Sequence, residues 1–206
     1  MTDSPVNRAR PRRADVRDQV LRAAATAFAE HSYAAVSVSA IAAAAGFTKG
    51  AVYSNFGGKP ELFAAVFATE FTGLLGGVLT RALAAIEADG ASEPARAVGA
   101  SLARGVTQDQ RLPALLAEFR AVAAGDPELG RVYADLRLRQ RHELEQLLTG
   151  VADRVPLAHG VDVRVAATLL LTCVNGVSLE YAAAPESLPE PLIEAMLTHV
   201  MTGILA

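Results

Sequence analysis

A short stretch around residue 50 combines residue types that suit the binding of an oxyanion. Thr48 is a good helix N-cap, so Lys49 and Gly50 fall in the first turn of the helix that it predicts. The free amides and the positive end of that turn attract an anion, and Lys49 adds a full charge there. Gly50 removes side-chain bulk, which lets the backbone or a neighbour approach a partner closely. The stretch favours contact with phosphate groups, and three polar residues extend it along the same helix: Tyr53, Ser54 and Asn55.

Residues that would support catalysis or metal binding form no comparable pattern. The four histidines, at positions 31, 142, 159 and 199, are scattered without the spacing of metal ligands. The single cysteine, Cys173, excludes an internal disulfide and a thiolate metal cluster. No nucleophile with an adjacent base and no spaced pair of acids stands out. We expect no metal, no cofactor and no enzymatic activity, with an all-α enzyme as one rival interpretation.

The elements around this stretch are predicted to be three short helices. Apolar residues recur at three- to five-residue intervals from Ala14 to His31, as in an amphipathic helix. Ser37 is a good N-cap for a second helix from Val38 to Ala45, which Gly46 ends by adopting a positive φ. The third helix runs to about Phe56. A glycine in the turn between the second and third helices matches the helix-turn-helix plan, in which the last helix enters the major groove of DNA.

Charge divides unevenly along the chain. The whole sequence has a formal net charge of -3, but residues 1–60 hold eight Lys and Arg against four acids, whereas the remainder holds eleven against eighteen. The split predicts a basic module that meets phosphates and an acidic body that does not. We expect residues 1–13, rich in arginine, to form a disordered basic arm ahead of a DNA-binding domain at 14–59.

The rest of the chain, residues 60–206, is predicted to be a helical domain. Apolar residues make up 51% of the sequence and aromatic residues only 5%, which favours packed helices, and strand alternation is absent. Gly73, Gly76 and Gly77 predict a kink or a break in the first long helix. The expected fold is all-α, with further helices at 61–86, 94–106, 112–124, 127–148, 163–184 and 191–205.

The string VSVSAIAAAAGFTKGAVYSNFGGKPELF resembles the DNA-binding signature of the TetR family, the tetracycline-repressor-like regulators. The resemblance covers about sixty residues, including the arginine-rich arm, the segment FAEHSY, the turn AAGF, and Tyr53, Asn55, Phe56, Lys59 and Leu62. The C-terminal part resembles the family only in length and helical pattern. The resemblance implies an N-terminal three-helix DNA-binding domain followed by a helical ligand-binding and dimerisation domain.

The resemblance also implies that Tyr53 and Asn55 contact phosphates, although the amide of Asn55 can alternatively recognise adenine. Ser37 and Ser39 begin the helix that crosses the DNA backbone, so each either reaches a phosphate or serves only as a cap. Lys59, at the start of the fourth helix, has the same opportunity to bind phosphate. The candidate DNA-binding residues are Arg12, Arg13, Ser37, Ser39, Thr48, Lys49, Gly50, Tyr53, Ser54, Asn55 and Lys59.

Two features leave the strength of DNA recognition open. The arginines from Arg8 to Arg13 either insert into a minor groove or remain a solvated charge run. Ala40 and Ala51 replace polar residues often found in the family at these helix starts, which leaves fewer contacts to bases.

In the family, the last two long helices pair with their mates in a second subunit. Here the segment ATLLLTCVNGVSLEYAA is apolar nearly all round, as expected for a helix between its own core and a partner. Asn175 and Glu180 interrupt this surface and either fix the register of pairing or face a ligand. The candidate interface residues are Leu171, Val174, Gly176, Leu179, Leu197 and Met201.

A small-molecule pocket is expected within the helices from Glu61 to Leu148, with an apolar wall and a few polar groups. Arg120 is a further polar candidate there. The candidate ligand-binding residues are Phe71, Leu75, Glu118, Phe119, Val122, Tyr133, Arg137 and Asn175.

We therefore expect a cytoplasmic, homodimeric regulator that releases a palindromic operator when a small, lipophilic molecule binds, with repression favoured over activation. Neither a membrane span nor a signal peptide is expected, because charged, polar or glycine residues interrupt the apolar stretches. The second rival is a scaffold protein whose helix-turn-helix no longer binds DNA.

Overall fold

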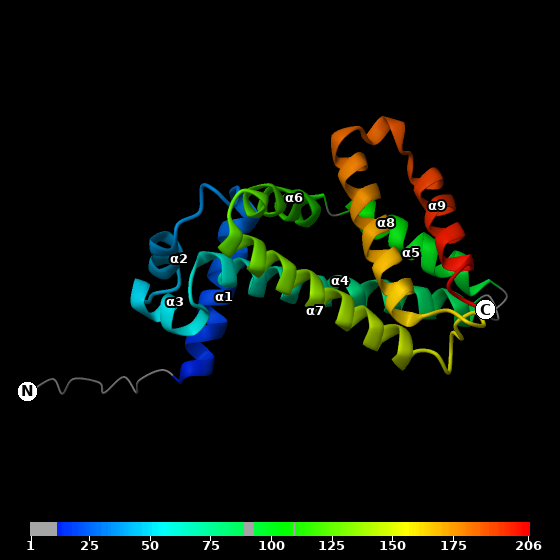
Figure 1. Ribbon diagram of the computed structural model, residues 1–206, viewed down its shortest axis with the longest axis horizontal. Helices are drawn as coiled ribbons and strands as arrows, with labels where there is room; N and C mark the ends of the chain where they lie inside the picture. The colour runs from blue at the N-terminus through cyan, green and yellow to red at the C-terminus, as the bar shows by residue number, and fades with distance from the viewer. Residues whose placement is uncertain (1–11, 89–92, 109) are drawn as a thin grey trace, which may run out of the picture. The chain divides into compact units, whose positions relative to one another are not determined.

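The computed structural model describes residues 12–88, 93–108 and 110–206, and these residues form helices, as the sequence predicts (Figure 1). Among them there is no strand beyond one isolated antiparallel bridge, between Leu157 and Leu205. The elements are α1 (Arg13–Glu30), α2 (Val38–Ala44), α3 (Lys49–Phe56), α4 (Lys59–Ala88), α5 (Pro94–Gln108), α6 (Arg111–Ala124), α7 (Pro127–Gly150), α8 (Val163–Ala183), the 3-10 helix η1 (Pro185–Ser187) and α9 (Glu190–Thr202).

The described chain divides into two compact units that meet inside α4. One unit ends at Val66 and the other begins at Phe67, whereas the boundary expected from the sequence lay at residues 59 and 60, where α4 starts. The predicted arm lies, through residue 11, outside the described residues. Arg13, expected in that arm, is instead the first residue of α1.

In the first unit, α1, α2 and α3 pack on one another around a small apolar core. Phe28 of α1 lies 5.1 Å, between ring centroids, from Phe63 at the start of α4, with the two rings perpendicular. Tyr33, in the loop after α1, meets Phe63 at the same centroid distance. Edge-to-face contacts of this kind add to the stability that burial alone supplies. The three rings join α1, the following loop and the first turns of α4.

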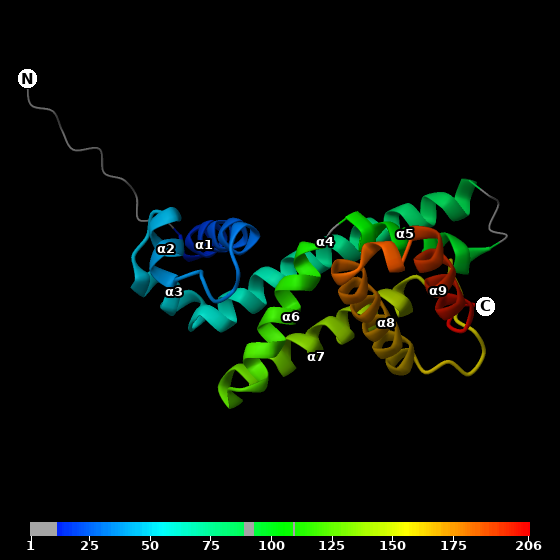
Figure 2. The ribbon, with the colours of Figure 1, turned by 90° about the horizontal axis from the view of Figure 1, so that it is seen from above.

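The second unit is a bundle in which α8 packs on α5, α6, α7 and α9, and α5 packs closely on α9. Helices α8 and α9 lie side by side and are joined through η1 (Figures 1 and 2). A Cβ atom placed on Gly99 of α5 would lie only 2.3 Å from Oγ1 and 2.8 Å from the backbone nitrogen of Thr198 on α9. The absence of a side chain at Gly99 therefore permits backbone-to-backbone contact between these two helices.

The three glycines of α4 do not split it, because α4 is one helix from Lys59 to Ala88. Phe71 and Val78, which flank the glycines, are buried and anchor the helix on both sides. By length and composition alone, α4 and α8 are long and apolar enough to cross a membrane. In the most apolar window of each helix, 39% of α4 and 33% of α8 is buried inside the chain.

Candidate nucleic-acid interface and ligand cavities

The turn between α2 and α3 is built by hydrogen bonds that only a positive-φ residue allows. Gly46 has a φ of 75°, and its N–H donates to the carbonyl of Ala43 at 3.1 Å. The N–H of Phe47 donates to the carbonyl of Ala42 at 2.9 Å. These two bonds make a Schellman motif, which ends a helix and satisfies its last carbonyls. The backbone geometry of the predicted turn therefore follows from one glycine.

Helix α3 begins with a side-chain cap and exposes its first turn. Thr48 Oγ1 accepts a hydrogen bond from the N–H of Ala51 at 3.3 Å, which occupies the threonine as an N-cap. Lys49 and Gly50 are exposed, and the Lys49 ammonium lies 5.7 Å from the centroid of the Tyr53 ring. Tyr53 keeps 47% of its surface exposed although it is a large aromatic residue. The other face of α3 buries Val52 completely, so Lys49 and Tyr53 are held outward by the core beneath them.

Ser54 and Asn55 are partly engaged within α3. The hydroxyl of Ser54 donates to the carbonyl of Ala51 at 3.1 Å, and Nδ2 of Asn55 donates to the same carbonyl at 2.7 Å. Asn55 is half-buried. Its side-chain N–H is thus oriented by the helix rather than free, in contrast to the exposed Lys49 and Tyr53.

Two arginines of α1 reach the carboxyl end of α3. Arg13 Nη2 donates to the carbonyl of Ser54 at 3.2 Å, and Arg17 Nη1 donates to the carbonyl of Asn55 at 3.0 Å. The Arg17 guanidinium also lies 4.5 Å from the centroid of the Phe56 ring. Cations at the negative end of a helix are favourable, so these residues support the position of α3. Sequence reasoning missed Arg17, although its four-residue spacing from Arg13 on one helix was the available signal.

The remaining candidates lie outside α3 in the first unit. Ser37 accepts from the N–H of Ala40 at 3.1 Å and therefore acts as the cap of α2, while Ser39 and Arg12 are exposed. Lys59, half-buried, donates to the carbonyl of Ala34 at 3.4 Å and lies 4.5 Å from the centroid of the Tyr33 ring. Ser37 thus caps α2 and is exposed, and its contact with phosphate stays a prediction.

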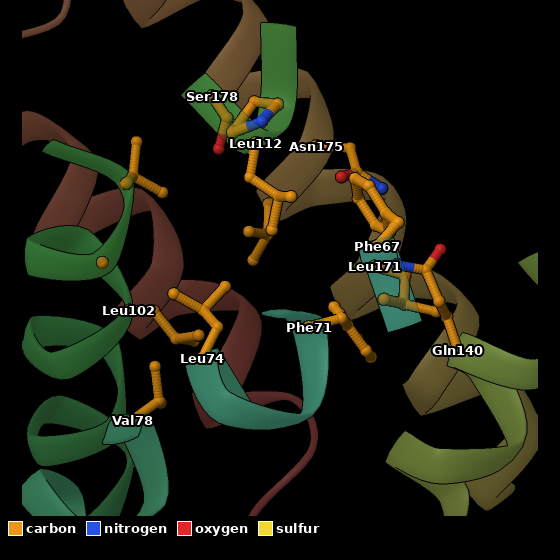
Figure 3. Close-up of a pocket in the computed structure, with 14 residues that line it drawn as sticks. Phe67, Phe71, Leu74, Val78, Leu102, Leu112, Gln140, Leu171, Asn175 and Ser178 are labelled. Atoms are coloured by element: carbon orange, nitrogen blue, oxygen red, sulfur yellow. The ribbon is translucent and has the colours of Figure 1, made fainter. Parts of the chain in front are cut away.

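The second unit contains a mostly apolar cavity of about 60 Å³ between α4, α5, α6, α7 and α8. Leu74, Val78 and Leu102 lie on one side of it, and Leu171, Asn175 and Gln140 on the other (Figure 3). Gln140 and Ser178 are buried polar residues of this wall that the sequence did not single out.

A second cavity, of about 220 Å³, lies between α6, α7 and α8 and is more polar. Arg120, Tyr133 and Arg137 line it together with Thr172 and Asn175. Arg137 Nη1 donates to Oε1 of Gln140 at 2.8 Å. Burial lowers the pKa of Arg137, and the neighbouring charge of Arg120 lowers it further, while Tyr133 raises it. Asn175 and Pro113 border both cavities, which are therefore neighbours.

The predicted ligand residues divide between cavity walls and other places. Phe71 lines the first cavity, Tyr133 and Arg137 line the second, and Asn175 lines both. Leu75 lines a third, almost wholly apolar cavity of about 60 Å³. Glu118, Phe119 and Val122 line none of these three cavities; Phe119 is buried in the core and Val122 is exposed.

The predicted interface residues also differ in position. Leu171, Leu197 and Met201 are already buried within the chain, Val174 and Leu179 are half-buried, and Gly176 is exposed. The exposed apolar side chains of the last two long helices are instead Val165 and Leu169 on α8 and Leu192 and Met196 on α9.

Two family models match the sequence. One, described as bacterial regulatory proteins of the tetR family, matches residues 20–66, and the other, described as the C-terminal domain of BetI-type transcriptional repressors, matches residues 91–206. The first match contains the turn at Gly46 and all of α3, and the second contains most of the helical bundle. A comparison with curated proteins returned no match.

Solved structures with the same fold cover nearly the whole chain. A Rhodococcus sp. protein assigned to the TetR family aligns with a TM-score of 0.67 and 19% identity, over 94% of this chain and 100% of its own. A transcriptional regulator from Rhodococcus sp. Rha1 aligns with a TM-score of 0.58 and 26% identity, over 91% and 95%. SmeT from Stenotrophomonas maltophilia, the repressor of a multidrug efflux pump, aligns with a TM-score of 0.53 and 22% identity, over 93% of each chain.

Proposed function

The chain belongs to the TetR family of bacterial regulatory proteins, and on that premise we propose that it is a dimeric repressor that releases a palindromic operator when a small, lipophilic molecule binds its C-terminal unit. Members of this family are DNA-binding transcriptional regulators that respond to small-molecule effectors, and they are not enzymes. They are soluble proteins, and we place this one in the cytoplasm, where its operator is located.

The observation that carries the DNA-binding half of the proposal is the exposed first turn of α3. Lys49, Gly50 and Tyr53 face solvent on a helix whose start is capped and whose opposite face is buried. A cation and free amides at a helix N-terminus, with a phenol one turn further along, suit the phosphates that flank a major groove. We propose that Lys49 and Tyr53 bind phosphates and that Gly50 lets α3 approach the duplex.

The residues around α3 take supporting roles in this proposal. Ser39, Arg12 and Arg13 are exposed and are proposed to contact the DNA backbone, Arg13 from a position where it also donates to the Ser54 carbonyl. Ser37 and Thr48 position helices as caps, and their exposed hydroxyls remain able to reach phosphate. Lys59 adds positive charge, and Ser54 and Asn55 give α3 its remaining polar surface.

We propose that the dimer forms through the exposed faces of α8 and α9. Val165 is 63% exposed, and Leu169, one helical turn later, is 45% exposed. Leu192 and Met196 repeat the same spacing on α9. Neighbouring apolar side chains left in water indicate a protein contact surface. Leu171, Leu197 and Met201 already fill the core. The proposed interface therefore uses the four exposed side chains, Val165, Leu169, Leu192 and Met196, together with Gly176.

The effector is proposed to occupy the cavities of the second unit. The two neighbouring cavities that Asn175 borders are each smaller than the roughly 300 Å³ at which typical ligand sites begin. Effector binding therefore favours a wider arrangement of the bundle that is rarely populated without it. Helix α4 carries Lys59 in its first turn and Phe71 and Leu74 in a cavity wall, so a change in the bundle reaches the DNA-binding unit along one continuous helix.

The test is a measurement of DNA binding by the full chain, on a duplex that the protein selects from a randomised pool. Lys49→Ala and Tyr53→Ala are each expected to weaken binding by at least about tenfold, and Lys49→Ala also lowers the salt dependence by about one phosphate contact. Arg139→Ala removes an equal charge from an exposed position on α7 and serves as the matched control. Sedimentation must show an intact dimer in every variant.

Gly50→Ala separates DNA contact from folding. A Cβ at this position would meet only Thr48 Oγ1, at an ordinary 3.7 Å, so the fold accommodates it. We expect weaker DNA binding with an unchanged or higher melting temperature. If neither Lys49→Ala nor Tyr53→Ala alters the affinity, the site is misassigned. If the wild-type protein selects no duplex at all, the chain is a scaffold rather than a regulator.

A further inference from the structure

The second cavity of the bundle carries positive charge in an otherwise acidic part of the chain. Residues 61–206 hold eleven Lys and Arg against eighteen Asp and Glu. Nevertheless, the ten residues that line this cavity include Arg120 and Arg137 and no acid. Random placement of charge in this region would favour the opposite sign.

Three helix faces converge to build this arrangement. Tyr133 and Arg137 are one turn apart on α7 and therefore share a face. Arg120 is contributed by α6, and Asn175 by α8. The cavity thus combines two guanidinium groups, a phenol and an amide in a space of about 220 Å³.

Arg137 has a neutral partner where a half-buried cation usually has a carboxylate. Its guanidinium donates to Gln140, and in the described part of the chain no acid lies within ion-pair distance of it. Burial disfavours the charged form and lowers its pKa most; Tyr133 opposes this shift, and the charge of Arg120 adds to it. A half-buried arginine remains charged. An anion that enters the cavity therefore compensates for both the lost hydration of Arg137 and its repulsion from Arg120.

The adjoining cavity supplies space of the opposite character. It shares Pro113 and Asn175 with the charged cavity, and its walls are apolar side chains such as Leu74 and Leu102 (Figure 3). A ligand that spans both therefore needs a charged end and an apolar end.

We infer that the effector is an amphipathic organic anion, whose carboxylate or phosphate binds Arg137 and Arg120 and whose apolar tail extends past Asn175 between α4 and α5. This inference rests on the proposed effector-responsive function and specifies the class of molecule that the bundle accepts. Guanidinium groups bind both kinds of anion through paired hydrogen bonds.

The test is calorimetric titration of the full-length dimer, without DNA, with octanoate and octyl phosphate and with octan-1-ol as the uncharged counterpart. Binding of either anion in clear preference to octan-1-ol is expected. Arg137→Gln should weaken anion binding by at least about tenfold, and the more exposed Arg120→Gln by about threefold. The matched control, Arg139→Gln, should have no effect, and no variant should change the affinity for octan-1-ol.

Several results would overturn the inference. These are equal affinity for octan-1-ol and the anions, no binding of either anion, or anion binding that neither arginine variant weakens. Thr172 and Gly176 of this cavity are exposed on α8, so dissociation of the Arg137→Gln dimer would show that a carboxylate of the partner fills the cavity instead.

Circular dichroism of each variant checks that it folds, and Arg120→Gln, at an exposed position, keeps the test available if Arg137→Gln does not fold. DNA binding is measured separately on the selected duplex. A wild-type protein that binds octanoate but no duplex contradicts the proposed function and not the ligand class, whereas one that binds duplex but no anion contradicts only the ligand class.

Discussion

The two units of this chain place their functional residues differently. In the first unit, Lys49 and Tyr53 lie on the surface of a short helix, and nearby caps and one glycine turn determine where they point. In the second unit, Arg137 and Asn175 lie between helices that are far apart in the sequence. Presentation on a surface depends on local signals, whereas an interior site depends on how whole helices pack. The two units should therefore respond differently to mutation.

The largest expected effect comes from removing a buried aromatic side chain from the core of one unit at a time. Phe28 is buried between Tyr33 and Phe63, and Phe28→Ala should destabilise the first unit by about 3–5 kcal/mol through the cavity that it leaves. DNA binding should be lost while the dimer and its cavities persist. Scanning calorimetry together with sedimentation measures both consequences.

The matched variant in the other unit is Phe119→Ala, since Phe119 is also fully buried. It should lower the stability of the helical bundle and spare the isolated transition of the first unit. If either substitution lowers a single common transition, the units do not unfold separately and the comparison fails.

The second prediction concerns the exposed face of α8. Leu169→Glu introduces a charge where we propose that two subunits meet, and it should raise the dissociation constant of the dimer by about a hundredfold or more, because a buried unpaired charge is costly. Analytical ultracentrifugation gives the constant. Leu138→Glu, at a similarly exposed leucine on α7, is the control and should leave the dimer unchanged. Equal effects of the two variants would remove α8 from the interface.

The smallest expected effect comes from replacing one glycine by alanine in each unit. Gly46→Ala should destabilise the first unit by about 1–2 kcal/mol, because its positive φ is strained for any residue with a Cβ although the space around it is open. Gly73→Ala, inside α4 and also facing open space, should instead stabilise the second unit by about 0.5–1 kcal/mol. Urea unfolding of each variant provides the free energies. If both substitutions change the free energy of unfolding in the same direction, the positive φ of Gly46 is not what the turn requires.

The same contrast explains how far the sequence predicted the structure. For the helix-turn-helix, Ser37, Gly46 and Thr48 are local signals, and α2 and α3 begin and end within one residue of the expected positions. For α9, both helix faces are apolar, so the pattern could not tell Leu197, buried in the core, from Leu192, exposed on the surface. Phe119 was expected in a pocket and lies in the core, because an apolar pattern does not distinguish a residue of a cavity wall from a residue of the core. Gln140 escaped notice because a glutamine in a charged helix ordinarily faces water.

The close approach of α5 and α9 at Gly99 restricts how the bundle can change shape. At Gly99 the Thr198 backbone lies in the space that a Cβ would occupy, so no side chain of α5 separates the helices there. Along α5, side chains also join the two helices on either side of this point, through Arg96 with Glu194 and Thr107 with Glu190. We expect α5 and α9 to move as one rigid block, so expansion for an effector falls to α4, α6 and α7. Fluorophores attached to α6 and α7 would therefore report occupancy of the cavities, whereas a pair attached to α5 and α9 would stay silent.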